Sequence, residues 1–582
     1  MSAVLTAQEP SAKYLVNLQP SLVRHFDLIA QAPGGVARLR ELILTLAVQG
    51  KLVLQDPSDE PASVLLQKIR AEKNQLIAEG KIKRNKPLAE IADEEKPFEL
   101  PEGWSWARLV SLCSYIQRGK GPVYAEHSTH RVISQKCIRW YGLDLGPARF
   151  ITPESLTKYE DIRYLKSGDL LWNSTGTGTI GRACLVPQEL NDDGLVADSH
   201  VTVVRPVGMD SVYLWRWIQS PYVQNEIEGS ASGTTNQIEL NTSTVINQLI
   251  PVPPLAEQSR IVTRVEELMR LCDALEASGQ LEAQQHAQLV GALLGTLTQS
   301  ETPEALADNW QRIATHFDLL LDRPEAVDAL EQTILQLAVR GLLVPQDPTD
   351  EPASVLLQKI RTEKEHLIAQ GKIKRDKPLP PITVEEKPFE LPLGWEWVRL
   401  GEVADNRLGK MLDKAKNTGK RYPYLRNTNV QWRYIDLDDI KEISLEESEL
   451  DEFLLVPGDL LICEGGYPGR CAIWDHPERK MYFQKALHRV RPRAGIAVEL
   501  IAISLEVDSK SGDLDSYFTG ATIKHFVGQA LDRYVFPLPP LDEQIRILSR
   551  VNELRKICTV LRQRMVASRE LQSHLAEVFS GG

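Results

Sequence analysis

The sequence is an internal duplication, and this limits the folds that the chain can adopt. His25-Phe26-Asp27 returns as His316-Phe317-Asp318, and the same offset of 291 holds without a gap as far as Leu109 and Leu400. Within this stretch, residues 46–84 match residues 337–375 at 31 of 39 positions. Self-similarity of this kind marks a repeated structural unit. Each half is therefore predicted to begin with the same helical segment, including helices near residues 62–78 and 353–369, each led by a proline-rich turn and a Ser or Asp cap.

A second repeat, at an offset of 286, closes each half. Pro251-Val-Pro-Pro-Leu-Ala-Glu257-Gln258 corresponds to Pro537-Leu-Pro-Pro-Leu-Asp-Glu543-Gln544. Apolar residues then alternate by four and three, which predicts a coiled-coil seam on each of two long helices. The alternative is that each helix docks on its own domain. The seam residues are Ile261, Val265, Leu268, Cys272 and Leu275 in the first helix, and Ile547, Val551, Leu554, Cys558, Leu561 and Met565 in the second.

Between these repeated helical parts lie two mixed regions of different sequence. Each opens with a Gly-Trp-x-Trp pattern, at Trp104 and Trp106 and at Trp395 and Trp397, which predicts a strand whose aromatic side chains pack in a core. Each also contains a Gly-Asp-Leu-Leu turn, beginning at Gly168 or Gly458, that enters a buried strand. The fold class is therefore α+β, with two mixed domains held by similar long helices as a pseudo-twofold pair.

Composition places the chain among ordinary globular proteins. With 582 residues, about four domains are expected, and 42% hydrophobic with 25% charged residues is typical of packed cores. No apolar stretch reaches the length of a membrane helix, and the first 20 residues do not resemble a signal peptide. We therefore expect a cytoplasmic protein whose seven cysteines, none in a CxxC pair, are reduced.

The net charge of −12 is unfavourable for a nucleic-acid ligand, so the local distribution of charge matters. A basic strip runs from Arg407 to Arg426 with Asp413 as its single acid, and a weaker strip runs from Arg118 to Arg139. A solvated face is the alternative for either strip. Their matching positions in the two halves favour a shared role.

Several side chains in the mixed regions are suited to DNA. Gly119-Lys120 and Gly409-Lys410 occupy equivalent places and fit a phosphate contact. Arg suits guanine and Asn or Gln suits adenine in the major groove, although polar surface residues occur there by chance as well. The small polar loops that contain Asn236 and Lys524 are ordinary turns or phosphate contacts. The candidate DNA-binding residues are Lys120, Gln135, Lys136, Arg139, Asn236, Lys410, Lys420, Arg421, Arg426, Asn427, Asn429 and Lys524.

Catalytic motifs are not found in the sequence. Gly176-Thr-Gly178-Thr-Ile-Gly181 spells the dinucleotide-binding fingerprint, but the residues after it are strand-like and the βαβ frame is missing. There is no P-loop, no Asn-Pro-Pro-Tyr, no nuclease motif and no metal-binding spacing among the eleven histidines. We expect no catalysis, no metal and no cofactor in this chain.

Taken together, the Gly-Trp-x-Trp openings, the Gly-Asp-Leu-Leu turns, the Pro-x-Pro-Pro-Leu-x-Glu-Gln closings and the heptads resemble the specificity subunits of type I restriction enzymes. The resemblance covers most of the chain from about His25. It implies that each mixed region is a target-recognition domain that reads one half of a split site in double-stranded DNA, and that the long helices form an antiparallel spacer. It also implies two methyltransferase subunits that use S-adenosylmethionine to methylate adenine, and two restriction subunits that use ATP and Mg.

The resemblance divides the chain into five segments. These are an N-terminal helical scaffold (1–95), the first target-recognition domain (96–254), a central helical region (255–385), the second target-recognition domain (386–540) and a C-terminal helix (541–582). The helical segments at about 21–95 and 303–385 depart from the common pattern, and we expect them to add surface for the methyltransferase. A duplicated scaffold that binds proteins rather than DNA is the alternative function, and an enzyme that uses the Gly-rich loop is a second one.

Overall fold

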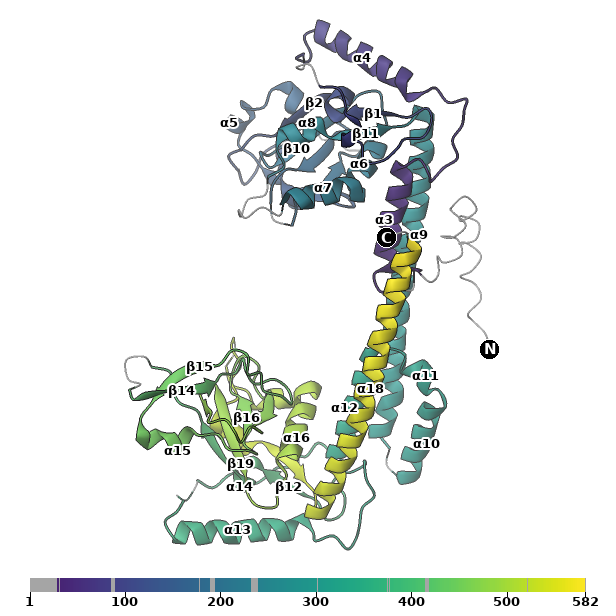
Figure 1. The fold of residues 1–582 in the computed structure, drawn as a ribbon. Coiled ribbons are helices and arrows are strands. Elements are labelled where there is room, and N and C mark those ends of the chain that lie inside the picture. The colour runs from purple at the N-terminus through teal and green to yellow at the C-terminus, as the bar shows by residue number, and fades with distance from the viewer. Residues whose placement is uncertain are drawn as a thin grey trace. The chain divides into compact units, whose positions relative to one another are not determined.

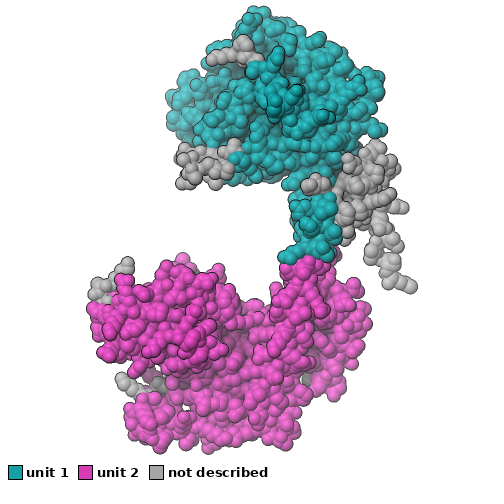
Figure 2. Space-filling model, viewed as in Figure 1, with its two compact units in different colours: residues 1–281, 569–582 teal, residues 282–568 magenta. Residues whose placement is uncertain are grey.

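The computed structural model describes residues 29–30, 32–84, 89–176, 178–188, 194–231, 239–300, 302–373, 375, 377–413, 418–520 and 522–580. They form two compact units (Figure 2): unit 1 comprises residues 1–281 with 569–582, and unit 2 comprises residues 282–568. Each unit contains one mixed region and parts of both long helices.

Unit 1 has a mixed region flanked by helices (Figure 1). Its helices are α3 (Gly35–Val48), α4 (Ala62–Ala78), α5 (Pro153–Leu156), α6 (Ser211–Gln219), α7 (Pro221–Ala231), α8 (Thr242–Asn247) and the first part of α9 (Leu255–Thr298). Its strands are β1 (Ser105–Arg108), β2 (Cys113–Arg118), β3 (Arg131–Ile133), β4 (Ile138–Arg139), β5 (Gly142–Leu143), β6 (Arg149–Phe150), β7 (Leu170–Asn173), β8 (Ala183–Leu185), β9 (Leu195–Ala197), β10 (Val201–Pro206) and β11 (Leu249–Val252).

Unit 2 repeats this arrangement. Its helices are α10 (Pro303–Thr315), α11 (Phe317–Leu320), α12 (Pro324–Val339), α13 (Ala353–Ala369), α14 (Leu400–Val403), α15 (Leu450–Phe453), α16 (Val498–Ser511), α17 (Gly528–Arg533) and most of α18 (Leu541–Ser580). Its strands are β12 (Glu396–Arg399), β13 (Ala404–Leu408), β14 (Lys420–Leu425), β15 (Lys441–Leu445), β16 (Leu460–Cys463), β17 (Cys471–Ile473), β18 (Tyr482–Phe483), β19 (Leu487–Pro492) and β20 (Val535–Leu538).

The two mixed regions share three sheets of the same topology although their sequences differ, and unit 1 has a further two-stranded sheet of β4 and β5. In unit 1 a four-stranded antiparallel sheet has the order β2-β10-β7-β8, a second sheet has the order β6-β3-β9, and β1 pairs with β11. In unit 2 the corresponding orders are β13-β19-β16-β17, β15-β14-β18 and β12-β20. In both units the second sheet is mixed, because β3 runs parallel to β9 and β14 runs parallel to β18. The predicted α+β fold with an internal repeat is confirmed.

The repeated Glu-Gln at the start of each long helix fastens the mixed region to that helix. Glu257 is 1% exposed and accepts hydrogen bonds from Trp104 Nε1 at 3.0 Å and from Gln55 Nε2 at 2.7 Å. Glu543 accepts from Trp395 Nε1 at 2.9 Å and from Gln346 Nε2 at 2.7 Å. The duplicated Gln, Trp and Glu positions therefore build one buried carboxylate clamp in each unit.

A glycine allows the chain to pass closely over each clamp. Gly50 has a φ of 68°, and a Cβ atom there would lie 2.5 Å from Pro101. Gly341, its equivalent, has a φ of 71°, and its Cβ would lie 2.5 Å from Pro392. Both the left-handed backbone and the close approach require glycine.

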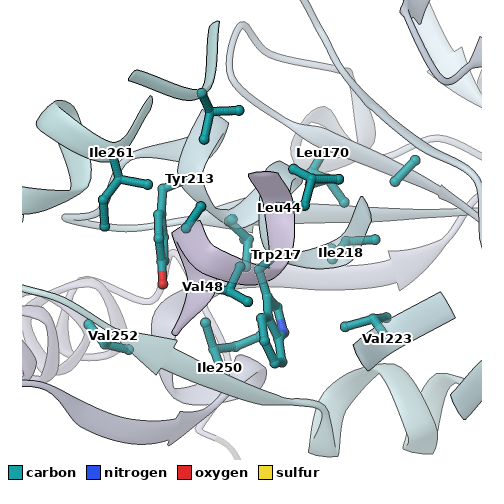
Figure 3. Close-up of a cluster of buried hydrophobic side chains, with 14 of the residues drawn as sticks. Leu44, Val48, Leu170, Tyr213, Trp217, Ile218, Val223, Ile250, Val252 and Ile261 are labelled. Atoms are coloured by element: carbon teal, nitrogen blue, oxygen red, sulfur yellow. The ribbon is translucent and has the colours of Figure 1, made fainter. Parts of the chain in front are cut away.

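The first seam packs in the core of unit 1. Ile261, Val265, Leu268 and Cys272 are buried with side chains of α3 and with Ala576 of α18, while Leu275 is half-buried against them. Figure 3 shows Ile261 in one cluster with Leu44 and Val48 of α3 and with Tyr213 and Trp217 of α6. The seam therefore packs against the short helix of its own repeat as well as against α18.

The second seam packs in two clusters of unit 2. Ile547 and Val551 are buried with Leu335, Ala338 and Val339 of α12, whereas Cys558 lies in another cluster with Leu554, Leu561 and Met565. That second cluster also contains Val290, Leu294 and Leu297 of α9. As in unit 1, the early turns of the seam pack on the short helix of the same repeat.

The two long helices pair in an antiparallel sense. Cys272 of α9 shares a cluster with Ala576, near the end of α18, whereas Val290 shares one with Cys558, in an earlier turn of α18. These two contacts are equivalent at the offset of 286, because Cys272 corresponds to Cys558 and Val290 to Ala576. The predicted antiparallel pairing and pseudo-twofold repeat are confirmed.

The repeated helical segments belong to the cores of the units. Leu39, Ile43, Ala47 and Val48 of α3 are buried in unit 1, so the segment at 21–95 is not merely an added outer surface. Helices α4 and α13 have the predicted bounds, but prolines precede them at Pro61 and Pro352, and neither has a side-chain cap. The predicted Ser or Asp cap was wrong: backbone carbonyls take its place at the first turn, where Ala62 N donates to Gly103 O and Ala353 N to Gly394 O, both at 2.8 Å.

Two further features bear on the class of protein. All seven cysteines are free and buried. Among the described residues, no helix combines the length and the apolar character that membrane crossing requires.

Candidate nucleic-acid interface

A glycine-containing hairpin connects a central strand of the four-stranded sheet to its edge strand in each mixed region. In unit 1 it joins the antiparallel strands β7 and β8, and Gly176, Gly178 and Gly181 in it all have positive φ. In unit 2 the equivalent hairpin joins β16 to β17 and contains Gly466 and Gly469, again with positive φ. We call residues 174–182 and 464–470 the glycine hairpins, of which Thr177 is not described. A turn between antiparallel strands is not the βαβ frame of a dinucleotide site, which confirms the rejection of that fingerprint.

The polar segments predicted to read bases lie beside these hairpins. Gln135 in unit 1 lies next to Gly176, where a Cβ atom would approach its Oε1 to 2.8 Å, and Asn173 Nδ2 donates to Gln135 O at 3.2 Å. In unit 2, Asn427 Nδ2 donates to Gly465 O at 3.2 Å. The structure thus brings Gln135 and Asn427 to matching places beside the two hairpins.

The loop before each closing strand also reaches the hairpin. Leu240 N donates to Ser174 O, and Phe526 N donates to Glu464 O, both at 2.8 Å. Asn236 lies outside the described residues. Lys524 is described and half exposed, with its Nζ 2.6 Å from Asp515 Oδ2.

The two Gly-Lys pairs occupy equivalent backbone positions. Gly119 N donates to Val201 O and Gly409 N to Leu487 O, both at 3.0 Å. A Cβ atom on either glycine would clash with the neighbouring strand, at 1.9 Å from Ala197 O or 2.3 Å from Gln484 O. The lysine side chains differ, because Lys120 is exposed whereas Lys410 is paired with Glu449.

Acidic residues partly neutralise the basic strip of unit 2. Arg407 pairs with Glu452, and Arg426 Nη2 lies 2.7 Å from Asp439 Oδ2. Arg421, which is 78% exposed, is 3.8 Å from Glu442. Lys420 is exposed at the start of β14, and Lys414 and Lys416 lie outside the described residues. Acidic residues that follow the strip in the sequence, at positions 439–452, therefore pair with several of its arginines. The positive charge of the strip is smaller than the sequence of residues 407–426 suggests.

The weaker strip of unit 1 leaves two lysines exposed. Lys136 is exposed on the turn after Gln135, as is Lys120 on the adjoining loop. Arg139 Nε is 3.7 Å from Asp144 Oδ2, a loose ion pair that leaves the Arg139 side chain 37% exposed. Unit 1 thus offers Lys120, Lys136 and Arg139 to an anionic ligand near its hairpin.

Asn429 has a different place from the one expected of a base-reading side chain. It is 2% exposed. Its Oδ1 accepts from Arg426 N at 3.0 Å, and its Nδ2 donates to Asp436 O and Asp439 O at 3.0 and 3.1 Å. Both ends of the amide are used by the loop, so Asn429 holds the loop in shape.

Exposed aromatic side chains lie on the same segments and were not among the sequence candidates. Tyr467 in the unit 2 hairpin is 69% exposed, with the guanidinium of Arg470 4.8 Å from its ring centre. Tyr141, after Arg139 and Trp140, is 79% exposed. An aromatic residue at a hairpin tip or after a cationic turn is the signal that could have identified them.

Buried ion pairs anchor the strands that carry the hairpins. Asp169, buried before β7, accepts from Arg205 Nε and Nη2, both at 2.6 Å. Asp459, its equivalent before β16, accepts from Arg491 Nε at 2.5 Å and Nη2 at 2.9 Å. These bidentate pairs explain the aspartate of the repeated Gly-Asp-Leu-Leu turns.

The strand next to each hairpin contains a buried polar side chain at the same position. Thr202 Oγ1 in unit 1 lies 2.6 Å from Ser174 Oγ, and His488 Nε2 in unit 2 lies 2.9 Å from Phe526 O. Burial lowers the pKa of His488 to about 4. The imidazole is therefore neutral near pH 7 and donates its Nε2 proton to that carbonyl.

Side chains that could form a metal centre are not gathered near the hairpins. No group of three or more His, Cys, Asp and Glu residues suited to a metal ion occurs in the described part of the chain. The hairpin surfaces instead combine lysine and arginine with amide and aromatic side chains. This chemistry suits phosphates and base edges.

Comparisons with known proteins agree with this chemistry. The family model described as Type I restriction modification DNA specificity domain matches residues 101–284 and 392–565. The chain is 37% identical over 563 residues to the Type I restriction enzyme EcoAI specificity subunit of Escherichia coli, covering 94% of this chain and 93% of that protein. It is 34% identical over 564 residues to the EcoEI specificity subunit of the same organism, with the same coverage. The crystal structure of the HsdS subunit from Thermoanaerobacter tengcongensis aligns with a TM-score of 0.38 and 20% identity, covering 83% of this chain and 98% of that one.

Proposed function

The chain belongs to the family of type I restriction-modification DNA specificity subunits, and from this premise we propose that unit 1 and unit 2 each read one half of a bipartite DNA target. A specificity subunit determines which DNA its complex recognises and is itself not catalytic. The observation that most supports two separate half-sites is the matched topology of the units with different side chains beside the glycine hairpins, Gln135 in one and Asn427 in the other.

The placement of the candidate residues divides them into proposed roles. Gln135, Arg426 and Asn427 contact base edges, and Lys120, Lys136 and Lys420 contact phosphates. Arg139, Lys410, Arg421 and Lys524 exchange an acidic partner for phosphate. Asn429 positions the loop that carries Arg426. Asn236 remains a proposed contact on sequence grounds alone.

The five-segment division extends the proposal to the partner subunits. In it the mixed regions at 96–254 and 386–540 are target-recognition domains, and the helical segments at 1–95, 255–385 and 541–582 form the scaffold. Two methyltransferase subunits that use S-adenosylmethionine, and two restriction subunits that use ATP and Mg, assemble on this scaffold. The chain itself contributes recognition of double-stranded DNA and the spacing of the two half-sites.

Helices α4 and α13 are proposed as contacts for the methyltransferase. Each buries few side chains, for example Leu65 and Ile69 of α4, and leaves the others exposed or half-buried. The test exchanges Arg70 and Glu72, two exposed residues of α4, for residues of opposite charge and measures co-purification of the methyltransferase. A deletion of 1–95 is a poor test, because it would also remove the buried residues of α3.

The function is tested by co-expressing the chain with its methyltransferase and mapping methylated adenines across genomic DNA. We expect a split motif with two specified halves separated by a fixed number of unspecified bases. An uninterrupted motif would contradict the assignment of one half-site to each unit. If the complex methylated no adenine and bound DNA without dependence on salt, the protein-binding scaffold would be the better description.

A further inference from the structure

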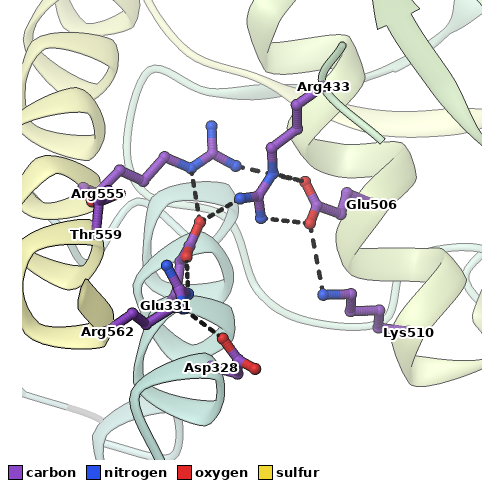
Figure 4. Close-up of polar contacts among 8 residues, drawn as sticks. All are labelled: Asp328, Glu331, Arg433, Glu506, Lys510, Arg555, Thr559 and Arg562. Carbon is purple, nitrogen blue, oxygen red and sulfur yellow. Dashed lines mark hydrogen bonds and ion pairs between the residues drawn. The ribbon is translucent and has the colours of Figure 1, made fainter. Parts of the chain in front are cut away.

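An ion pair joins the short helix to the long helix in each unit, with opposite polarity. In unit 1, Arg40 on α3 lies 2.7 Å from Asp273 Oδ1 and 2.7 Å from Glu276 Oε2 on α9. In unit 2 the acids are on the short helix. Glu331 on α12 contacts Arg562 on α18, and Asp328 Oδ1 is 2.6 Å from Arg562 Nε (Figure 4).

The residues with reversed charge are equivalent in the duplication. Arg40 corresponds to Glu331 at the offset of 291, and Glu276 corresponds to Arg562 at the offset of 286. Their apolar neighbours are unchanged in type. Leu39, Ile43 and Leu44 of α3 correspond to Leu330, Ile334 and Leu335 of α12, and Leu268, Cys272 and Leu275 of α9 correspond to Leu554, Cys558 and Leu561 of α18.

The apolar contacts between the helices cannot by themselves assign a short helix to one long helix. Among the apolar contacts, only those with the mixed regions differ, since α3 packs on Tyr213 and Trp217, whereas α12 packs on Leu500 and Ile503. Crosswise docking, of α3 on α18 and of α12 on α9, would bury the same types of side chain. The connections do not forbid it either, because residues 49–104 lie between α3 and β1, and residues 340–395 lie between α12 and β12. Chains of that length can span far more than the length of a helix.

The charges distinguish the two arrangements. Crosswise docking would place Arg40 against Arg562, and Glu331 against Asp273 and Glu276. Crosswise docking would also deprive Glu331 of its ion pair with Arg555, because the residue of α9 that corresponds to Arg555 is Met269.

Glu331 is the more sensitive of the two positions because it is 2% exposed. Burial opposes its charged form, but Arg562, Arg433 and Arg555 outweigh that effect and lower the pKa of its carboxyl group. A buried charge that loses its partners is strongly destabilising. Like charges brought together exclude wrong partners in the same way.

We propose that this charge reversal assigns α3 to α9 and α12 to α18, and so excludes exchange of the two short helices within the chain or between two copies of it. The apolar side chains supply the attraction between the helices. The ion pairs distinguish between the two long helices, which the apolar seams of the duplication do not, and they act together with the contacts of each short helix with its own mixed region.

The test uses the full-length chain and a carbodiimide, which couples a carboxylate to a lysine amine only when the two are in contact. Arg562→Lys provides the reporter amine. In this variant we expect coupling of Lys at position 562 to Asp328 or Glu331, read by mass spectrometry of the peptides. Adding Arg40→Glu removes the attraction of α3 for α9 and creates one for α18. We then expect a new link between positions 40 and 562, within one chain or between two; the reporter alone cannot form it, because Arg40 has no carboxylate to couple.

Two further variants serve as controls. Glu276→Arg, added to Arg40→Glu and Arg562→Lys, restores an ion pair in unit 1 and should abolish the link between positions 40 and 562. Lys51→Glu, an equal change of charge at an exposed position just after α3, should produce no link to position 562. If Arg40→Glu prevents folding and the added Glu276→Arg restores it, the proposal is also supported. The proposal is overturned if the Arg40→Glu chain folds with native links only, or if Glu276→Arg rescues neither folding nor pairing.

Discussion

At the scale of the residue, Asp508 makes stability depend on pH. Its carboxylate accepts a hydrogen bond from Tyr534 Oη at 2.6 Å, near the end of α16. Burial raises the pKa of Asp508 to about 6, the bond from Tyr534 opposes that rise, and the charge of Asp513 adds to it. A carboxyl whose pKa is raised by folding stabilises the native state below its unfolded pKa, and that contribution is lost as pH rises through about 6.

We therefore expect Asp508→Asn to flatten this dependence. In the native protein up to about 3 kcal/mol of unfolding free energy should be lost between about pH 4 and pH 6.5, since one pKa unit corresponds to about 1.4 kcal/mol. Urea denaturation across that range measures the free energy of unfolding of both proteins. As pH rises, the stability of the Asn variant relative to the unsubstituted protein should increase. A constant difference would show that Asp508 has an ordinary pKa.

Arg426 is the residue at which base reading is most directly tested. Its Nη2 is held by Asp439, and its Nε is buried without a hydrogen-bond partner among the described residues. Arg426→Ala should weaken binding by roughly 1–3 kcal/mol for one half-site only, the range of a bidentate contact to guanine. Competition binding with DNA altered in either half measures this. Equal loss on unrelated DNA would make Arg426 a phosphate contact instead.

At the scale of the element, the two carboxylate clamps should contribute equally to their units. In Glu257→Gln and in Glu543→Gln the new amide offers one acceptor oxygen where the carboxylate offered two, so either the buried Trp donor or the exposed Gln donor loses its partner, at a cost of about 1–3 kcal/mol. Denaturation of each variant should show a similar loss of unfolding free energy. Glu553→Gln, on the exposed face of α18, should change it by no more than about 0.5 kcal/mol. A loss in only one clamp variant would mean that the two sites are not equivalent.

Arg433 links a loop of the second mixed region to the helices beneath it. It is a non-glycine residue with a φ of 72°, and its guanidinium contacts Glu331 of α12 and Glu506 of α16 (Figure 4). Both acids are 2% exposed. The ion pairs therefore hold the backbone in a conformation that a side chain disfavours.

Replacing Arg433 separates the ion pairs from the backbone strain. Arg433→Ala should lower the unfolding free energy by about 3 kcal/mol, because two buried carboxylates lose a partner. Arg433→Gly loses the same contacts but relieves the left-handed backbone, so it should be more stable than the Ala variant by about 0.5–1 kcal/mol. Chemical denaturation of both proteins measures the difference. An Ala variant as stable as the Gly variant would indicate a relaxed backbone at this position.

At the scale of the whole molecule, an acidic chain must bind DNA through a few accessible cations. The net charge is −12, and acidic partners occupy much of the basic strip in unit 2. The affinity for DNA should still fall with salt, with a slope set by the number of phosphates contacted. Lys120→Ala and Lys420→Ala should each reduce the slope by about 1 on any DNA sequence. Lys51→Ala, outside both mixed regions, is the control and should leave the slope unchanged. If neither Lys120→Ala nor Lys420→Ala changes the slope, the proposed phosphate contacts are contradicted.

The sequence by itself determined the repeated architecture. The period of a repeat and the spacing of its apolar residues can be read directly from the chain. The sequence therefore predicted the duplication, the long helices with their apolar seams, the bounds of α4 and α13, and the buried Gly-Asp-Leu-Leu strands. The family resemblance rested on the same local patterns. Each of these depends on residues close in the chain or on copies of one segment.

Only the tertiary structure decided what distant residues do to one another. Asn429 looked like a base-reading side chain, but its loop folds back and uses both ends of the amide. The acids that neutralise the basic strip, the bonds from Gln55 and Trp104 to Glu257, and the reversed pairs at Arg40 and Glu331 all join segments far apart in sequence. Burial and partner identity belong to the packed chain, because a side chain's charge and hydrogen bonds are set by its neighbours in space.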